Sequence, residues 1–275
     1  MAENQKFNYT ELIASSLNGN QKSLETLIKN IQDKAYNLSA RYLWNTLDAE
    51  DATQEILLKV LTNLSKFRGE SSFTTWVYRV ATNYLLNMKR TLVEDLTFEE
   101  GEQHLKKGMG YPAYEKADTD LLEEEVKIAC STSMLICVSR PLRLTYFLGE
   151  ILEFDSNEGA YILEIEPATF RKRLSFARKR IRCFMANQCG IYDPKNPCRC
   201  SKQINYCLEV DWFKPNTLKF ADKGKVEQAK REIETFMSDA AIFQSHPYYA
   251  TPDGVLESIK SLLNNNNFPL LINKK

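Results

Sequence analysis

The fold of this chain is decided by one stretch, Asp48–Arg90, which reads DAEDATQEILLKVLTNLSKFRGESSFTTWVYRVATNYLLNMKR. It contains two amphipathic helical patterns joined by a short polar segment. In the second pattern, apolar side chains recur at the spacing of one buried helical stripe: Val77, Val80, Ala81, Tyr84, Leu85 and Met88. The opposite face carries Trp76, Arg79, Asn83, Asn87 and Arg90. Such a face suits single-stranded nucleic acid, because phosphates bind cations and bases stack on aromatic rings. A solvated face with a half-buried tryptophan is the alternative.

The first pattern, over residues 48–66, has a different outer face. Its carboxylates lie in the first helical turns, where they suit the positive end of the helix dipole. That explanation leaves out Leu58, which lies beside Asp51, Gln54 and Glu55 on the outer face. An apolar side chain framed by carboxylates favours a contact with another protein.

Composition limits the class of protein. The 275 residues carry 36 Lys and Arg against 36 Asp and Glu, so a nucleic-acid partner must be argued from local clusters. No stretch approaches the ~20 apolar residues that span a bilayer, and the N-terminus lacks a signal-peptide pattern, so we expect a cytoplasmic protein without a membrane partner. With only two histidines, His104 and His246, a nucleophile, base and orienting group are not apparent, and we expect no enzyme activity.

Helical periodicity predicts an all-α protein with two small helical domains, a linker and a short C-terminal extension. The predicted limits are 11–90 for the first domain, 91–120 for the linker, 121–186 for the second domain and 187–275 for the extension. The linker prediction rests on lost periodicity, clustered acidic residues and several Gly and Pro residues. Ser23 is a candidate N-cap in the first domain, and Pro141 predicts a helix break in the second.

Residues 155–184 have the pattern of a helix-turn-helix, in which Pro167 begins the second helix. Glu164 falls at the turn position where glycine is common, and a left-handed conformation there costs about 1 kcal/mol. The second helix contains no carboxylate from Ala168 to Phe184, and its seven cations predict DNA binding, because an unmixed basic face repels itself unless a polyanion neutralises it. Its first turns hold the candidates for the major groove, and the later cations are candidates for phosphates. These two sets are Thr169, Arg171, Lys172 and Arg173, followed by Arg178 and Lys179.

The Asp48–Arg90 stretch resembles conserved region 2 of bacterial RNA polymerase sigma factors of the extracytoplasmic-function (ECF) type, in the sigma-70 family. The resemblance is carried by an ordered series of residues: Asp48, Glu50, Asp51, Thr53-Gln54-Glu55, Lys59-Val60, Phe67 to Phe73, Thr75-Trp76, Tyr78-Arg79 and Ala81-Thr82-Asn83. Residues 155–184 correspond to sigma region 4. The resemblance covers about residues 11–90 and 121–184.

This resemblance implies a sigma factor that binds core RNA polymerase, recognises the −35 and −10 promoter elements and promotes DNA melting. It implies that the first helix docks on the polymerase clamp through Asp51, Gln54, Glu55 and Leu58. It implies that region 4 reads the −35 element, that the linker threads the polymerase channels, and that an anti-sigma factor is a candidate partner. The residues implied in −10 recognition are Phe67, Arg68, Phe73, Trp76, Arg79, Asn83, Lys89 and Arg90. For Phe73, core packing is an equal alternative.

Two other classes of protein compete with this interpretation. A helix-turn-helix regulator that acts without core polymerase explains residues 155–184 but not the Asp48–Arg90 stretch. A protein-binding adaptor explains the acidic face but not the basic helix.

The extension after Cys183 contains clustered thiols. Four thiolates are enough for a tetrahedral zinc site, and the candidate ligands are Cys189, Cys198, Cys200 and Cys207. A redox-sensitive cluster and inert thiols are the alternatives, while Cys130 and Cys137 are expected in the core. Helices are expected over 222–243 and 252–263, and we expect them either to dock on the two domains, masking a binding face, or to remain a solvated appendage.

Overall fold

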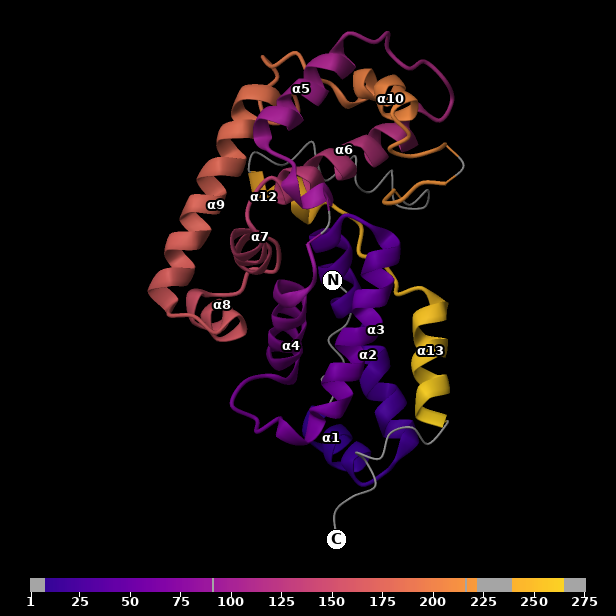
Figure 1. Ribbon diagram of the computed structural model, residues 1–275, viewed down its shortest axis with the longest axis vertical. Helices are drawn as coiled ribbons and strands as arrows, with labels where there is room; N and C mark the ends of the chain where they lie inside the picture. The colour runs from indigo at the N-terminus through magenta and orange to yellow at the C-terminus, as the bar shows by residue number, and fades with distance from the viewer. Residues whose placement is uncertain (1–7, 91, 216, 222–238, 265–275) are drawn as a thin grey trace. The chain divides into compact units, whose positions relative to one another are not determined.

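The computed structural model describes residues 8–90, 92–215, 217–221 and 239–264. In these residues the elements are helices, and there is no β-strand. The predicted all-α class is confirmed. The chain forms two compact units. The first comprises residues 1–88, 162–164 and 249–275, and the second comprises residues 89–161 and 165–248. Figure 1 shows the elements of both.

The first unit is a helical bundle. Its helices are α1 (Tyr9–Leu17), α2 (Gln21–Leu43), α3 (Thr46–Thr62) and α4 (Phe73–Asn87), with a 3-10 turn η1 (Leu64–Lys66) after α3. Helix α2 packs on α1, α3 and α4. Its N-cap is Asn20, whose side chain accepts a hydrogen bond from the Ser23 N–H, so the predicted Ser23 cap is wrong. Ser72 caps α4 by accepting from the Thr75 N–H.

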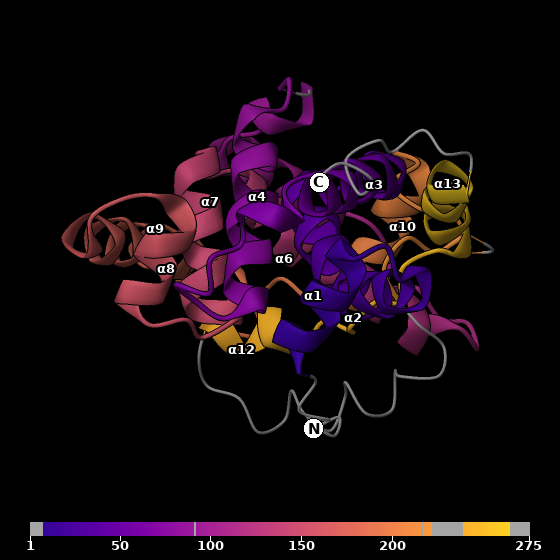
Figure 2. The ribbon, with the colours of Figure 1, turned by 90° about the horizontal axis from the view of Figure 1, so that it is seen from below.

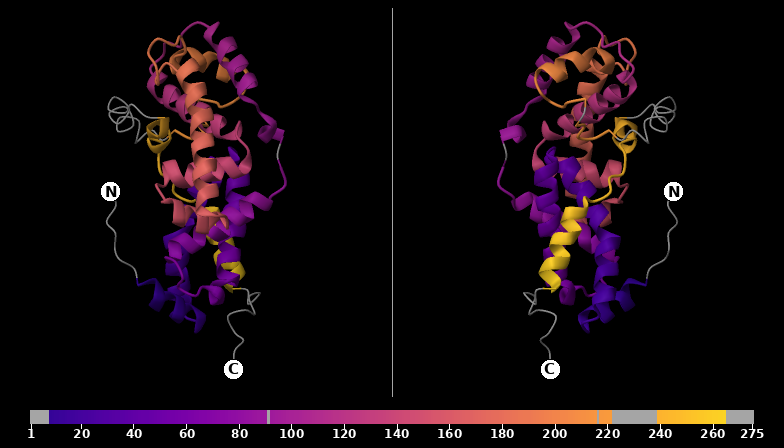
Figure 3. Two further views of the ribbon diagram at one scale, coloured as in Figure 1. Left: turned by 90° about the vertical axis from the view of Figure 1, so that its left-hand side faces the viewer. Right: turned by 90° about the vertical axis from the view of Figure 1, so that its right-hand side faces the viewer.

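The C-terminal segment returns to this bundle. Helix α13 (Asp253–Asn264) packs against α3 and buries Val255 and Ile259 (Figures 1 and 3). The turn before it is held by α2, where the buried Asn37 amide both donates to the Tyr249 carbonyl at 2.7 Å and accepts from the Tyr249 N–H at 2.9 Å. Docking of the 252–263 helix is therefore confirmed for this part of the extension.

In the second unit, several helices pack on α6 (Thr119–Ile136). Helix α7 packs on both α6 and α9, and α10 packs on both α5 and α6 (Figure 2 shows α6, α7 and α9). Pro141 lies in the first turn of α7, at the predicted break. The elements are η2 (Leu92–Asp95), α5 (Phe98–Met109), α6 (Thr119–Ile136), α7 (Arg140–Tyr146), the π-helical turn η3 (Phe147–Ile151), α8 (Ser156–Leu163), α9 (Pro167–Gln188), α10 (Cys200–Glu209) and α12 (Asp239–Gln244).

The predicted linker is more ordered than its sequence suggested. Thr97 and Glu100 form a reciprocal capping box at the start of α5, and α5 packs on α6, α9 and α10. Just before it, the buried Glu94 carboxylate accepts from the Arg140 Nε at 2.7 Å and from Nη2 at 2.6 Å. Residues 98–109 of the predicted linker therefore form a packed helix, because capping and tertiary packing compensate for a weak apolar pattern.

The predicted C-terminal extension is divided between the two units. Residues 187–248 fall in the second unit, and residues 249–275 fall in the first. Most of the predicted 222–243 helix lies outside the described residues, apart from α12. His246 is buried and its Nε2 lies 2.7 Å from the Ser131 hydroxyl, so this histidine is a packed one. None of the helices that the structure describes is both long and apolar enough to cross a membrane.

Candidate polymerase and nucleic-acid interfaces

The outer face of α3 keeps the character that the sequence predicted. Asp51 and Glu55 are exposed, while Gln54 and Leu58 are half-buried. The inward face is closed by residues such as Ile56 and Val60, both fully buried. The pKa of Tyr84 on α4 is raised, first by burial and then by the negative charges of Glu55 and Asp51. This face therefore offers carboxylates beside a partly covered leucine, which suits a basic or mixed protein surface.

Three aromatic rings form a cluster at the start of α4. The Phe67 ring lies edge-on to Phe73 with centroids 5.4 Å apart, and 5.5 Å from Trp76. Phe73 and Trp76 stack with centroids 5.8 Å apart, and the Tyr9 ring centroid lies 5.1 Å from that of Phe73. Phe73 is buried, whereas Phe67 and Trp76 are half-buried. Phe73 thus supports the other two rings, which leave aromatic surface for a flat ligand.

Polar candidates surround this cluster in the sequence. Arg68 and Asn83 are exposed, and the Asn83 amide oxygen accepts from Asn87 Nδ2 at 2.8 Å. Arg79 is half-buried. Lys89 and Arg90 are exposed and fall in the second unit.

The helix-turn-helix predicted over 155–184 is present as α8 and α9. Asp155 caps α8 by accepting from the N–H groups of Asn157 and Glu158 at 2.7 and 2.9 Å. Gly159 lies against the buried Phe170, where an added Cβ would come within 2.3 Å of the ring. Glu164 has a φ of 53°, the left-handed turn conformation that the sequence placed at this residue.

Helix α9 buries one stripe and exposes its charges. Phe170, Ala177 and Ile181 are buried, and Leu174 is half-buried. Of the candidates for DNA binding, Arg171, Lys172 and Lys179 are exposed, and Thr169, Arg173 and Arg178 are half-buried. The Arg171 guanidinium also donates to the Ser156 hydroxyl at 3.2 Å, which joins the two helices of the motif.

Two features of α9 were not predicted. Arg178 forms an ion pair with Glu150 of η3, so one cation of the basic face is already neutralised. Phe176 is 52% exposed, and the Arg180 guanidinium lies 6.0 Å from its ring centroid and 5.3 Å from that of Phe98. The position of Phe176 outside the buried stripe was visible in the sequence, but the Glu150 pair joins segments 28 residues apart.

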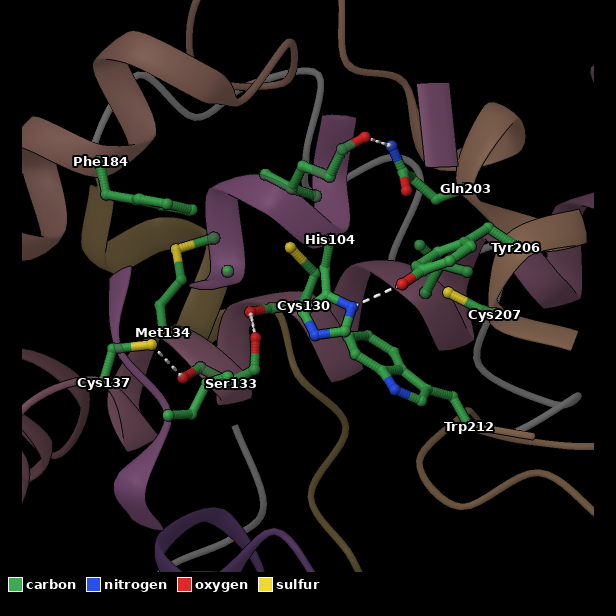
Figure 4. A pocket seen from close by; sticks show the side chains of 14 residues that line it. His104, Cys130, Ser133, Met134, Cys137, Phe184, Gln203, Tyr206, Cys207 and Trp212 are labelled. Atoms are coloured by element: carbon green, nitrogen blue, oxygen red, sulfur yellow. Dashed lines mark hydrogen bonds between the residues drawn. The ribbon is translucent and has the colours of Figure 1, made fainter. Parts of the chain in front are cut away.

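A cavity lies in the second unit between α5, α6 and α10 (Figure 4). His104 Nδ1 lies 2.5 Å from the Tyr206 hydroxyl on its wall, and Cys130, Cys207 and Trp212 also line it. None of the predicted promoter-contacting residues faces this cavity, so it is separate from the nucleic-acid candidates.

Comparisons with known proteins match the part of the chain that contains α3 and α4. The sigma-70 region 2 family matches residues 27–93, the part of the chain that contains α3, the aromatic cluster and α4. The RNA polymerase sigma-H factor of Pseudomonas aeruginosa is 26% identical over 181 residues, 62% of this chain and 90% of that protein. The ECF RNA polymerase sigma-E factors of Haemophilus influenzae and Escherichia coli K12 are 28% and 29% identical, over 59% of this chain and 87% and 86% of those proteins.

The chain thus combines a match to sigma-70 region 2 with a helix-turn-helix, and the relatives to which it is similar are RNA polymerase sigma factors.

Proposed function

We propose that this protein binds core RNA polymerase, directs it to promoters with particular −35 and −10 elements and promotes melting of the DNA there. In this role α3 contacts polymerase through Asp51, Gln54, Glu55 and Leu58. The Phe67–Trp76 aromatic surface stacks on bases of the opened strand, because stacking offsets the few kcal/mol that unstacking a base costs. Arg68, Arg79, Asn83, Lys89 and Arg90 contact phosphates or base edges around it.

Helix α9 reads the −35 element in this proposal. Thr169, Arg171, Lys172 and Arg173 lie in its first turns, which enter the major groove in helix-turn-helix proteins. Lys179 and Arg178 contact phosphates, and Arg178 exchanges or shares its Glu150 partner on binding. The protein contributes binding energy, while the polymerase supplies the chemistry of RNA synthesis.

One observation carries this proposal. The same chain contains a region 2 match at residues 27–93 and a helix, α9, with seven cations and no carboxylate. An isolated DNA-binding regulator has no use for the acidic α3 face, and a protein adaptor has no use for α9. The family match and both faces are explained together only by a subunit that bridges polymerase and promoter DNA.

The test is transcription in vitro from a genomic-fragment library, with purified core polymerase from the source bacterium and the full-length protein. We expect start sites that require the protein and share a −35/−10 pair. The Arg171→Ala/Arg173→Ala variant should abolish them, whereas Lys107→Ala/Lys214→Ala removes two exposed cations of the same unit and should not. If no start site depends on the protein and core polymerase does not bind it, the proposal is wrong.

A further inference from the structure

The cavity between α5, α6 and α10 brings together three parts of the chain that the sequence analysis treated separately. Helix α5 falls in the predicted linker, α6 belongs to the predicted second domain, and α10 lies in the predicted C-terminal extension. Both α5 and α6 pack on α10, and all of the lining residues belong to the second unit. Phe184 of α9 and Trp212, which follows α10, complete the wall. A molecule in this cavity therefore contacts all three parts at once.

The lining of the cavity is uncharged over most of its surface. Among the described residues that form it there is no Asp, Glu, Lys or Arg. Apolar side chains make up much of the wall, including Leu105, Val126, Met134 and Phe184. Burying a charged ligand here would cost free energy that no charged group on the wall offsets. The lining therefore excludes a charged ligand and favours an apolar one.

Three rings meet on one side of the cavity. The His104 ring centroid lies 6.0 Å from that of Tyr206 and 6.0 Å from that of Trp212 (Figure 4). Aromatic rings attract one another at centroid separations of about 4.5–7 Å, either offset-stacked or edge to face. A flat aromatic ligand suits this side of the wall better than an aliphatic chain does.

One polar atom on the wall is left for a ligand. Ser133 Oγ and Gln203 Nε2 already donate to backbone carbonyls, at 2.7 and 3.0 Å. The His104 Nδ1 atom lies 2.5 Å from the Tyr206 hydroxyl. Within the described part of the chain, no hydrogen bond is formed by the second ring nitrogen, Nε2. The cavity therefore offers an apolar space with a hydrogen-bonding atom at one point of its wall.

The direction of the bond between Tyr206 and His104 decides what Nε2 can do. If the tyrosine donates to Nδ1, Nε2 carries the hydrogen and donates to a ligand; if the tyrosine accepts, Nε2 of the neutral ring accepts from it. A hydroxyl group both donates and accepts, so it pairs with either form of the ring. We therefore expect a hydroxyl on the ligand.

The size of the cavity limits the ligand to a single ring. The centre of a water molecule can occupy about 30 Å³ of it, more than the about 10–15 Å³ that one water needs. In a compact cavity the walls lie about 1.4 Å beyond that volume, so the space enclosed is about 150 Å³. Engineered apolar cavities of about that size stay dry and bind benzene.

Three thiols also line the cavity, from Cys130, Cys137 and Cys207. Burial raises the pKa of both Cys137 and Cys207 to about 12, so at neutral pH they are protonated and act as small apolar groups. The described residues contain no group of three or more His, Cys, Asp or Glu that could hold a metal ion. The other thiols that the sequence offered as zinc ligands lie outside this lining: Cys189, Cys198 and Cys200.

We propose that this cavity is a binding site for a small uncharged aromatic molecule that carries one hydroxyl group, of the phenol class. The ring of the ligand packs among the apolar side chains and against Trp212, and its hydroxyl pairs with His104 Nε2. Because the cavity exists only in the folded second unit, binding stabilises that unit. This site is additional to promoter recognition and does not depend on it.

The test compares three ligands of similar size on the full-length protein by ligand-observed NMR. Phenol should bind at one saturable site with a dissociation constant of about 1 mM or below. Toluene replaces the hydroxyl by a methyl group and should bind about tenfold more weakly, and the charged benzoate should not bind. At ten times its dissociation constant, phenol should raise the melting temperature by about 2–5 °C.

Two variants and a control locate the site. His104→Phe keeps a ring but removes Nε2, so phenol binding should fall about tenfold while toluene binding changes less than about twofold. Cys207→Leu fills the cavity and should abolish binding of both. Cys183→Leu makes the same change at an exposed position of α9 outside the lining, and it should bind phenol like the natural protein.

Circular dichroism checks that each variant is folded, and if Cys207→Leu is not, the ligand series and His104→Phe still decide the question. The proposal is overturned if phenol shows no saturable binding up to about 10 mM. It is also overturned if benzoate binds as tightly as phenol, if His104→Phe leaves the preference for phenol over toluene unchanged, or if folded Cys207→Leu binds phenol like the natural protein.

Discussion

Helices α3 and α9 are built alike and charged oppositely. Each buries one apolar stripe and turns the other face outward. The outward residues of α3 include the carboxylates Asp51 and Glu55, while α9 contributes seven cations and no carboxylate of its own. The formal net charge of zero is therefore a sum of opposed local surfaces. Partner choice is decided by those surfaces, because charges screened over about 10 Å act locally.

The two helices also differ in how their charges are balanced. On α3, Lys59 lies 5.7 Å from the Tyr84 ring centroid, and the carboxylates raise the pKa of that tyrosine after burial. On α9, Glu150 of another element balances Arg178. We infer that α9 gains most from a polyanion, whereas α3 is suited to a protein surface.

The largest expected effect comes from the basic helix. Arg171→Ala/Arg173→Ala should raise the dissociation constant for a −35 duplex at least about 30-fold, because each good arginine–base contact is worth about 1–3 kcal/mol. Fluorescence anisotropy at several salt concentrations measures this, and any lost phosphate contacts would also flatten the salt dependence. An equal loss in Lys107→Ala/Lys214→Ala would show that only total charge matters and would break the comparison.

The next effect concerns the hydrogen bonds that hold the turn before α13 to α2, in the bundle that contains α3. Asn37→Ala removes both side-chain hydrogen bonds to the partly buried Tyr249 backbone, so we expect a loss of about 1–3 kcal/mol in the free energy of unfolding. Urea denaturation measures it. Asn63→Ala is the control, because the Asn63 side chain bonds only to Lys59 and Thr62 nearby, and it should cost less than about 0.5 kcal/mol. Equal costs would mean that the C-terminal segment adds nothing to this unit.

A smaller effect is expected from the acidic face itself. Asp51→Lys/Glu55→Lys should weaken binding to core polymerase by about tenfold, since exposed charge pairs contribute about 0.2–1 kcal/mol each and reversal adds repulsion. Binding of the −35 duplex should not change. Glu11→Lys/Glu257→Lys makes the same change in charge at exposed sites of the same unit. If this control weakens polymerase binding as much, α3 is not the docking face.

The smallest effect is a pH dependence in the second unit. Burial raises the pKa of Glu125, although its carboxylate accepts from the N–H groups of Lys219, Phe220 and Ala221 at 2.6–2.9 Å. The folded state holds this proton more tightly than the unfolded state, so the associated stability is present below about pH 4.3 and is lost as the pH rises through the folded-state pKa. The Glu125→Gln variant has no titrating carboxyl group at this position, so it does not lose this stability as the pH rises.

Urea denaturation of both forms from pH 4 upward tests the sign. The stability of Glu125→Gln relative to the natural protein should increase with pH and then level off above the raised pKa. A relative stability that falls as the pH rises would contradict the assignment.

The sequence by itself determined the elements that carry strong patterns. The stripes of α3, α4 and α9, the Pro167 start and the Glu164 turn follow from local spacing and backbone preference, which act within a few residues. The same patterns placed the two outward charged faces. The site roles of individual residues in those faces stay predictions.

Tertiary structure alone decided the rest. A weak apolar pattern became α5 because its capping box and its packing on three helices compensate for low periodicity. The burial of Phe73, the Glu150–Arg178 pair and the return of α13 to α3 all join distant segments. Sequence spacing carries no information about such encounters, because they depend on which surfaces pack together once the helices have formed.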